Sequence, residues 1–231
     1  DGSAIVTAWL IALTFPPLAP WWLVFTGTVF AIVIAKHLYG GLGQNPFNPA
    51  MVAFAVCIVS FPALMSQWPS VGLQMPLVEQ INIILGLAPR VDALSGATPL
   101  DALKTALKLG DGNVDVAHLL ANQDVFGNFA GRGWEWVAGG YLIGGLYLWE
   151  RKLITWHVPT AFLASMTLIS GALWLYSPAQ FANPLFHLLS GGAMIGAFFI
   201  ATDPVSGCTT PRGKLIFGAG AGLLAYIIRV F

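Results

Sequence analysis

Apolar runs that nearly reach the length needed to cross a bilayer constrain this chain more than any other feature. A helix needs roughly 20 predominantly apolar residues to span the hydrocarbon core, and several runs in the 231-residue sequence approach this length. A soluble protein would need polar surface on every element. Here only 9% of the residues are charged and 57% are hydrophobic, against about 25% charged in soluble domains. We therefore predict an all-α polytopic membrane protein surrounded by lipid.

Proline, tryptophan and charged residues divide the apolar sequence into about six or seven helical segments. The first is too short to span alone and stops at Pro16-Pro17, so we expect either a half-span or the end of a helix that begins upstream. In order, the predicted segments are Ala4 to Phe15, Leu23 to Ala35, Ala50 to Met65, Trp134 to Trp149, Ile154 to Tyr176, Leu185 to Ala201 and Leu215 to Phe231. They form two groups of membrane helices, 1–65 and 134–231. Because the sequence starts at Asp1 and ends inside an apolar run, we expect a fragment truncated at both ends.

The stretch 66–133 holds no apolar run long enough to cross a membrane and collects many charged residues, so we predict one sizeable extramembrane region there. Basic residues at the ends of the predicted spans indicate its side. Five of them share one side if the spans alternate: Lys36, Arg151, Lys152, Arg212 and Lys214. Cytoplasmic loops carry an excess of lysine and arginine. This count predicts that region 66–133 faces the periplasm.

The sequence also contains a weak internal symmetry. Helix, loop, Asn-Pro and helix occur twice, at Asn48-Pro49 and at Asn183-Pro184, in segments of opposite predicted direction. Inverted repeats with broken helices are typical of transporters, where irregular backbone is tolerated at membrane depth only if protein buries it. Two unrelated Asn-Pro pairs would give the same pattern by chance. The sequence leaves both interpretations open.

Charge, cysteine and histidine content exclude several functions. The formal net charge is 0 and no basic run is present, so the electrostatic signature of a nucleic-acid partner is missing. Cys57 and Cys208 lack neighbours at ligand spacing and are interpreted as small hydrophobes. His187 is the one histidine in an apolar segment, where a core imidazole is favoured over a metal ligand. We expect no metal site built by this chain alone.

The run Asp92-Ala93-Leu94-Ser95-Gly96-Ala97-Thr98 is the central motif. Taken by itself, it predicts a turn into a helix over Leu100 to Leu109, with Thr98 as N-cap and Pro99 at the first helical position. That structural role alone would explain the residues. A second interpretation is functional, because small neighbours leave the Thr98 hydroxyl accessible and a helix N-terminus would stabilise an attached phosphate.

The pattern Asp-x-x-Ser-Gly-Ala-Thr resembles the flavinylation motif at which a flavin transferase joins FMN to threonine through its phosphate. The surrounding sequence is similar to the membrane D subunits of the Rnf ion-translocating oxidoreductase family, which is related to the B subunits of the sodium-translocating NADH:quinone reductases. Three further motifs carry the resemblance, in the same order along the chain: Pro16 to Trp22, Tyr39 to Ala50 and His187 to Val205. The resemblance covers essentially the whole chain.

This resemblance implies a flavin-carrying subunit of a translocase, which is not catalytic alone. Covalent FMN on Thr98 would pass electrons between NADH and ferredoxin couples and drive sodium or proton movement, with Asp92, Ser95, Gly96 and Ala97 completing the motif. Thr98 is then a tether and not a catalytic residue. The family also suggests a non-covalent riboflavin. Implied partners are the other membrane and peripheral subunits, the flavin transferase and the lipid bilayer of a bacterial inner membrane.

Three more polar residues are candidates for a flavin, quinone or ion pathway. Asn45 and Asn48 lie in the Gly-rich loop 40–48, where the alternative is a broken-helix turn whose asparagines satisfy freed backbone groups. Asp203 is the acid nearest a predicted membrane segment, where a buried charge is a functional candidate. Pro204 favours instead a helix end at the interface, with Asp203 capping the next turn. Both interpretations of each residue remain open.

Two other functions compete with electron transfer. A solute channel or transporter with an inverted-repeat membrane fold would share the same helices, but it needs no exposed Thr98 within a long external region. A purely structural assembly subunit would explain the Gly-rich helices and leaves the Ser95 to Thr98 motif unexplained. We expect the flavin-carrying subunit.

Overall fold

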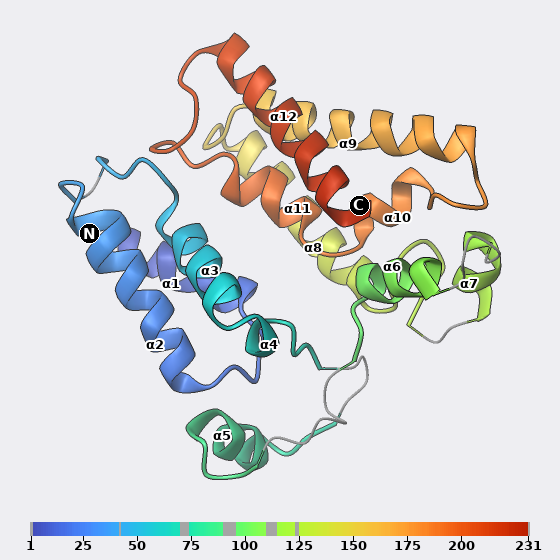
Figure 1. Cartoon of the computed structure of the whole chain (residues 1–231). Coiled ribbons are helices and arrows are strands. Elements are labelled where there is room, and N and C mark those ends of the chain that lie inside the picture. Colours follow the sequence, from blue (N-terminus) through green and yellow to red (C-terminus); the bar gives the residue numbers. More distant parts are fainter. Residues whose placement is uncertain are drawn as a thin grey trace. The chain divides into compact units, whose positions relative to one another are not determined.

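The computed structural model describes residues 2–41, 43–69, 74–89, 96–109, 115–122 and 125–230. These residues form helices and turns and contain no strand; Phe126 and Gly131 make one isolated bridge. The chain divides into two compact units, Asp1–Gly96 and Ala97–Phe231. Figure 1 shows the first in blue to green and the second in green to red. The predicted all-α class agrees with this structure.

Unit 1 consists of short helices that prolines separate. The structure assigns α1 to Ser3–Thr14, α2 to Trp21–Val29, its π-helical continuation η1 to Phe30–His37, α3 to Pro49–Ser60, α4 to Pro62–Met65 and α5 to Leu77–Leu85. Pro16-Pro17 follow α1 directly, as predicted. The prediction of one continuous helix over Ala50 to Met65 is wrong, because the structure divides this stretch into α3 and α4. Pro62 cannot donate the next helical hydrogen bond, and the chain breaks at Phe61, whose φ is −134° and ψ 55°.

Lys36 lies within a helix, although the predicted segment Leu23 to Ala35 ends before it. It lies in the last turn of η1, is 6% exposed and donates a hydrogen bond to the Ser3 hydroxyl of α1. An ammonium group buried within a helix says less about which side of a membrane a loop occupies than one in a short loop. The predicted cytoplasmic side therefore rests on the basic residues of unit 2.

Unit 2 contains two long helices and a set of shorter ones around them. In order they are α6 (Pro99–Leu109), α7 (Val116–Asn122), α8 (Trp134–Glu150), α9 (His157–Tyr176), α10 (Pro184–Leu189), α11 (Ala193–Ile195), the π-helix η3 (Gly196–Ile200) and α12 (Pro211–Val230). Buried Leu103 of α6 and Phe186 of α10 belong to one hydrophobic cluster. Helix α6 is thus packed onto the helices that follow it.

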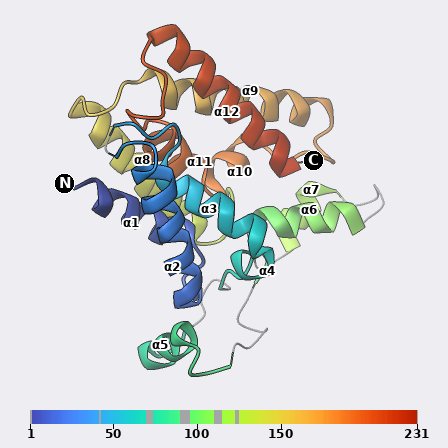
Figure 2. The ribbon, with the colours of Figure 1, turned by 60° about the vertical axis from the view of Figure 1, so that its left-hand side comes forward.

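Two glycines bring α12 against α9. An added Cβ at Gly218 would lie 2.7 Å from the Val158 carbonyl oxygen, and one at Gly222 would overlap the Phe162 carbonyl oxygen. The spacing Gly-x-x-x-Gly lets the backbones of apolar helices approach closely. The two helices run side by side in both ribbon views (Figure 1, Figure 2).

The predicted crossing segment Leu185 to Ala201 is not one helix. Helix α10 ends after six residues, and the chain turns at Ser190 and at Gly191, whose φ is +69°, before α11 begins. Glycine adopts positive φ at no steric cost. An added Cβ there would lie 2.9 Å from Leu100 Cδ1 of α6. The break therefore also makes room for α6.

Among the described residues, α9 and α12 are the helices long and apolar enough to cross a membrane, each with 20 residues. Three shorter apolar helices span Ser3–Thr14, Trp21–His37 and Pro49–Ser60. The structure is consistent with a helical membrane protein. The number of six or seven crossing segments, the membrane-based division at 65 and 133, and the periplasmic side of region 66–133 stay predictions.

Candidate functional site

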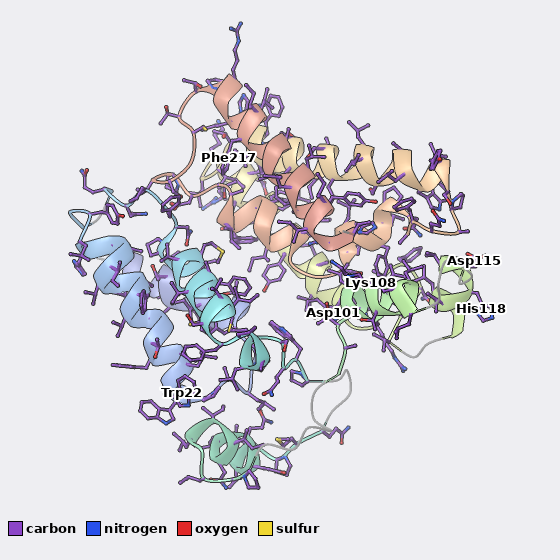
Figure 3. All side chains as sticks on the ribbon, in the orientation of Figure 1. Trp22, Asp101, Lys108, Asp115, His118 and Phe217 are labelled. Carbon is purple, nitrogen blue, oxygen red and sulfur yellow. The ribbon has the colours of Figure 1, made fainter. Side chains whose placement is uncertain are left out.

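Thr98 begins α6 as its N-cap. Its Oγ1 accepts a hydrogen bond from the Asp101 N–H at 3.3 Å, and its carbonyl accepts one from the Ala102 N–H at 2.8 Å. Pro99 occupies the first helical position, where its missing N–H costs nothing. The cap and helix start that the sequence predicts are confirmed. Figure 3 labels Asp101 in the first turn of α6 and Lys108 toward its other end.

The Thr98 hydroxyl also donates to the carboxylate of Asp101, with 2.8 Å between Oγ1 and Oδ2. The two residues therefore bond reciprocally, in a variant of the capping box in which the carboxylate at the third helical position accepts from the cap hydroxyl and not from the cap backbone N–H. Sequence reasoning missed Asp101 as a partner of Thr98. The signal that could have identified it is the spacing Thr-x-x-Asp, which is visible in the sequence.

The hydroxyl is accessible from solvent. Thr98 is half-exposed and Ala97 is exposed, while the Gly96 N–H donates to the Trp68 carbonyl at 2.9 Å. Small neighbours thus leave the hydroxyl open, as expected. Asp92 and Ser95, the other residues assigned to the motif, lie outside the described residues.

A phosphate on Thr98 fits this position as a tether, although with fewer helix donors than the sequence suggests. Pro99 has no N–H and the Asp101 N–H already bonds Thr98 Oγ1. The Leu100 N–H is the remaining early donor of α6. The Asp101 carboxylate next to the hydroxyl would repel a phosphate. The N-terminus of α6 therefore stabilises a phosphate on Thr98 less strongly than a helix N-terminus with free N–H groups and no nearby carboxylate would.

Thr210 provides an internal comparison. It precedes Pro211, its Oγ1 accepts from the Gly213 N–H at 3.1 Å, and its carbonyl accepts from the Lys214 N–H at 2.9 Å. Two threonines thus cap helices in the same way before proline. Only Thr98 follows Ser-Gly-Ala. Cap geometry alone does not single out a modification site, so any selection must rest on the preceding residues.

A wide pocket opens beside the start of α6. Pro99 packs directly on Gly131, where an added Cβ would overlap its ring. The residues on either side of Gly131 line a cavity of about 970 Å³, together with Phe126, Phe129, Glu135 and Trp136. One Glu135 carboxylate oxygen fixes this wall by accepting from the N–H groups of Phe129 and Ala130, both at 2.8 Å. The space is at the upper end for small-molecule sites.

The other candidate residues are engaged in local structure. Asn45 is buried and donates from Nδ2 to the Phe47 carbonyl at 3.0 Å. Asn48 caps α3 by accepting from the N–H groups of Ala50 and Met51. Both bonds fit the broken-helix turn. Whether either residue contacts a flavin, quinone or ion stays a prediction.

Asp203 caps the turn that follows η3. Its Oδ1 accepts from the Val205 N–H at 3.2 Å and its Oδ2 from the Ser206 hydroxyl at 2.6 Å. The interpretation of Asp203 as a turn cap is therefore confirmed. Its part in an ion or flavin pathway is untested. Among the residues that the structure describes, no group of three or more His, Cys, Asp or Glu side chains could hold a metal ion.

Comparison with known proteins decides the family. The sequence model of the NQR2, RnfD, RnfE family matches residues 1–231. The chain belongs to this family. The D subunit of the ion-translocating oxidoreductase complex of Alcanivorax borkumensis is 51% identical over 231 residues, which cover 100% of this chain and 67% of the relative. The corresponding D subunits of Pseudomonas aeruginosa and Yersinia pestis are 50% and 49% identical, covering 100% of the chain and 66% and 69% of their own lengths.

These relatives confirm the resemblance to the D subunits of ion-translocating oxidoreductase complexes. Their name describes one subunit of a complex and not an enzyme that acts alone, in agreement with that part of the prediction. The chain spans about two thirds of the length of the curated relatives that it matches.

One polar cluster of this family member was missed in the sequence. His187, Ser190, Tyr226 and Arg229 lie where α10 meets the end of α12; the Arg229 Nη1 donates to the His187 carbonyl at 2.6 Å. The available signal was Arg229 itself, a charge inside the last apolar run, because charges at such positions are rare and usually functional. The sequence presents His187 only as a core residue or a metal ligand, and neither role predicts this cluster.

Proposed function

We propose that this chain is the flavin-carrying part of an ion-translocating electron-transport complex, with FMN joined to Thr98 through a phosphoester. The supporting observation is the half-exposed Thr98 hydroxyl, which starts α6 at the end of a Ser-Gly-Ala-Thr run. The chain belongs to a family whose members include the D subunits of ion-translocating oxidoreductase complexes. Family membership and the Ser-Gly-Ala run before Thr98 together favour Thr98 over Thr210.

In this proposal the residues around Thr98 hold the flavin and do not react. FMN when bound supplies the electron-transfer chemistry. Forming the phosphoester removes the Thr98 hydroxyl proton, so the hydrogen bond to Asp101 is lost while the Asp101 N–H still faces Oγ1. Pro99 anchors the start of α6 on Gly131 and so keeps the tether fixed. The pocket lined by Phe126, Phe129 and Trp136 adjoins Gly131, on which Pro99 packs, and would shelter part of the flavin.

The complex would carry electrons between NADH and ferredoxin couples and move sodium ions or protons across a bacterial inner membrane. Other membrane and peripheral subunits would supply the remaining redox groups, and a flavin transferase would attach FMN from the periplasmic side. A second, non-covalent riboflavin in the membrane part belongs to the same proposal.

The covalent flavin is tested by a matched pair of threonine variants, made in the full-length subunit with its native partners and the flavin transferase. The wild-type subunit should give a fluorescent band under ultraviolet light after denaturing electrophoresis. Thr98→Ala should abolish the band completely, and Thr210→Ala should retain it, because Thr210 has the same cap and following proline without the preceding motif. A band that persists in Thr98→Ala would place the flavin elsewhere.

Mass spectrometry identifies the cofactor and the position together. The peptide that contains Thr98 should carry the mass of FMN less one water, and the peptide that contains Thr210 should be unmodified. An unmodified Thr98 peptide from active complex would refute the proposal, while a different added mass would keep the site and change the cofactor.

A further inference from the structure

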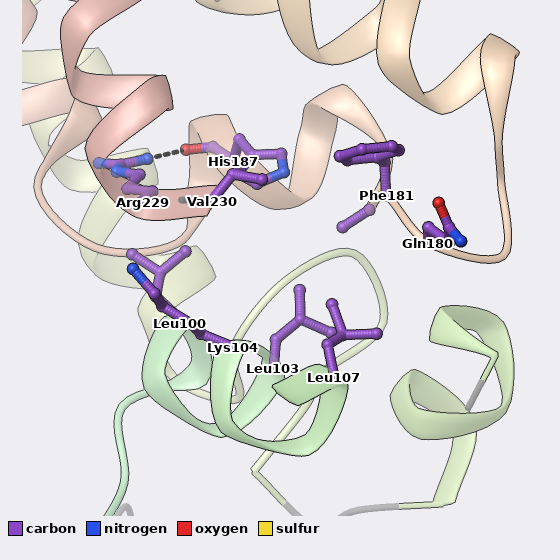
Figure 4. Close-up of a pocket in the computed structure, with 10 residues that line it drawn as sticks. Leu100, Leu103, Lys104, Leu107, Gln180, Phe181, His187, Arg229 and Val230 are labelled. Carbon is purple, nitrogen blue, oxygen red and sulfur yellow. Dashed lines mark hydrogen bonds between the residues drawn. The ribbon is translucent and has the colours of Figure 1, made fainter. Parts of the chain in front are cut away.

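Helix α6 and one wall of the wide pocket beside it belong to the same hydrophobic cluster. Leu103 of α6, Phe126 and Phe186 of α10 are buried in this cluster, and the rings of Phe126 and Phe186 lie 5.9 Å apart. Figure 4 shows Leu103 among the leucines that α6 directs toward α10. Protein interiors are packed as densely as organic crystals, so the helix that Thr98 begins and this wall hold a fixed relative position.

The wall is a short hairpin, residues 126–131, that hydrogen bonds hold in shape. Phe126 and Gly131 form its isolated bridge, and the Gly127 N–H donates to the Ala130 carbonyl at 2.7 Å. The Glu135 carboxylate of α8 accepts from two N–H groups at the hairpin tip. The tip is therefore presented to the pocket on a firm support.

Two aromatic side chains and one cation line this hairpin pocket. Phe129 at the hairpin tip is 59% exposed, and Trp136 in the first turn of α8 is 86% exposed. Aromatic surface left in water costs about 25 cal/mol for each Å². Within the described part of the chain, the Arg132 guanidinium has no hydrogen-bonding or charged partner. Exposed aromatic faces beside a guanidinium suit a planar aromatic group with an electron-rich edge.

The hairpin pocket is within reach of Thr98. The Pro99 ring packs on Gly131, and the next residue, Arg132, lines the pocket. Thr98 directly precedes Pro99, and neighbouring Cα atoms are about 3.8 Å apart. The ribityl phosphate arm of FMN is longer than this step. A ring tethered to Thr98 therefore reaches the pocket.

Volume distinguishes this pocket from a smaller cavity on the leucine side of α6. The cavity in Figure 4 has a volume of about 30 Å³, which is room for one water molecule. The hairpin pocket has about 970 Å³, at the upper end of the range for small-molecule sites. Of the two, the hairpin pocket is the one that can take a fused aromatic ring system.

We propose that the isoalloxazine ring of the flavin on Thr98 lies in the hairpin pocket, against the aromatic surface of Phe129 and Trp136, with Arg132 at its pyrimidine edge. The aromatic side chains shield the ring from water, and Arg132 stabilises the negative charge that the ring gains on reduction. These residues position and tune the flavin. The inference rests on the proposed function, because it requires FMN on Thr98.

A pair of tryptophan variants tests the position of the ring. The full-length, flavin-loaded subunit is purified in detergent, and its native flavin emission is divided by that of the denatured band. Trp136→Leu should raise this ratio severalfold, because an indole in contact with a flavin quenches its emission. Trp149→Leu is the matched control and should leave it unchanged, since Trp149 lies at the other end of the 17-residue helix, about 20 Å away.

A pair of arginine variants tests the charge at the ring. Arg132→Gln should lower the midpoint potential of the covalent flavin by about 30 mV, which corresponds to a tenfold change in a two-electron equilibrium. Arg151→Gln, just beyond the far end of α8, should leave the potential unchanged. Spectroelectrochemical titration of the same purified subunit measures both.

The denatured fluorescent band separates this inference from the proposed function. A wild-type subunit whose band does not depend on Thr98 would refute the proposed function. A tryptophan at the start of a membrane helix can instead anchor at the lipid interface. If the bands are equal but Trp136→Leu and Arg132→Gln keep the wild-type emission and potential, the ring lies outside the pocket and this inference alone fails. Phe129→Leu, on the exposed hairpin tip, repeats the emission test without altering α8.

Discussion

The two Asn-Pro helix starts of this chain are built alike and end differently. Asn48 and Asn183 each precede a proline at the first helical position, and each side-chain oxygen accepts from a backbone N–H in the first turn. Helix α3 then continues for 12 residues, whereas α10 stops after six at a glycine with positive φ. The same start therefore leads to an ordinary apolar helix in unit 1 and to a broken one in unit 2.

The polar groups around the two helices also differ in whether they have hydrogen-bond partners. In unit 1, Asn45 bonds the Phe47 carbonyl and Lys36 bonds Ser3, so the buried polar side chains have partners. In unit 2, His187 and Ser190 are buried beside the break and have none among the described residues. Buried polar groups without partners mark strained or functional positions. Among the described residues, the buried polar side chains without partners therefore gather in unit 2.

The largest expected change in stability comes from replacing one closely packed glycine in each unit by alanine. Gly222→Ala should destabilise the protein by about 3 kcal/mol, because the new Cβ overlaps the Phe162 carbonyl of α9 and backbone cannot easily move. Gly27→Ala in unit 1 should cost less, about 1 kcal/mol. Its nearest neighbours are the side-chain atoms Phe15 Cζ at 2.9 Å and Cys57 Sγ at 3.2 Å, which are buried but can shift more than backbone can. Thermal unfolding in detergent measures both.

Gly220→Ala is the control for helix propensity. Nothing lies within 4 Å of an added Cβ at Gly220, and alanine favours a helix over glycine by up to about 1 kcal/mol. This variant should be unchanged or slightly more stable. If Gly222→Ala behaved like Gly220→Ala, the close contact of α9 and α12 would be absent in solution.

The next effect distinguishes a cap from a ligand contact at the two asparagines. Asn48→Ala and Asn183→Ala should each destabilise the protein by about 1 kcal/mol, since each removes an N-cap acceptor. Serine is also a good N-cap, so Asn48→Ser and Asn183→Ser should restore most of this stability. Thermal unfolding is measured beside the rate of electron transfer through the complex. A stable Asn48→Ser variant that transfers electrons poorly would establish a functional contact at Asn48.

The elements of this fold were largely predictable because local signals determine them. Pro16-Pro17 stop α1, and Thr98-Pro99 begin α6, where cap and fixed φ act within one turn. The interruptions were harder to foresee. Leu185 to Ala201 is uniformly apolar, and hydropathy alone does not show that Gly191 turns the chain to make room for Leu100, about 90 residues earlier.

The candidate site was predictable only in part. The position proposed for the tether followed from a motif, whereas the partner of Thr98 depended on the spacing to Asp101. The polar cluster of unit 2 could not be assembled from sequence, because His187 and Arg229 meet only through the packing of α10 on α12. The sequence shows Arg229 as a charge inside an apolar run, but it does not show which neutral groups Arg229 contacts.

The smallest expected effect compares one buried hydroxyl from each unit, and the two should differ in sign. Thr7→Val in α1 should destabilise the protein by about 1 kcal/mol, because the buried Thr7 hydroxyl donates to the Ser3 carbonyl at 3.1 Å. Tyr226→Phe in α12 should stabilise it by about 0.5 kcal/mol, because its buried hydroxyl has no partner among the described residues and loses only a desolvation cost. Chemical unfolding of the purified complex measures both changes. A destabilising Tyr226→Phe would mean that water, lipid or another subunit bonds this hydroxyl. The buried polar groups of the two units would then not differ in whether they have partners.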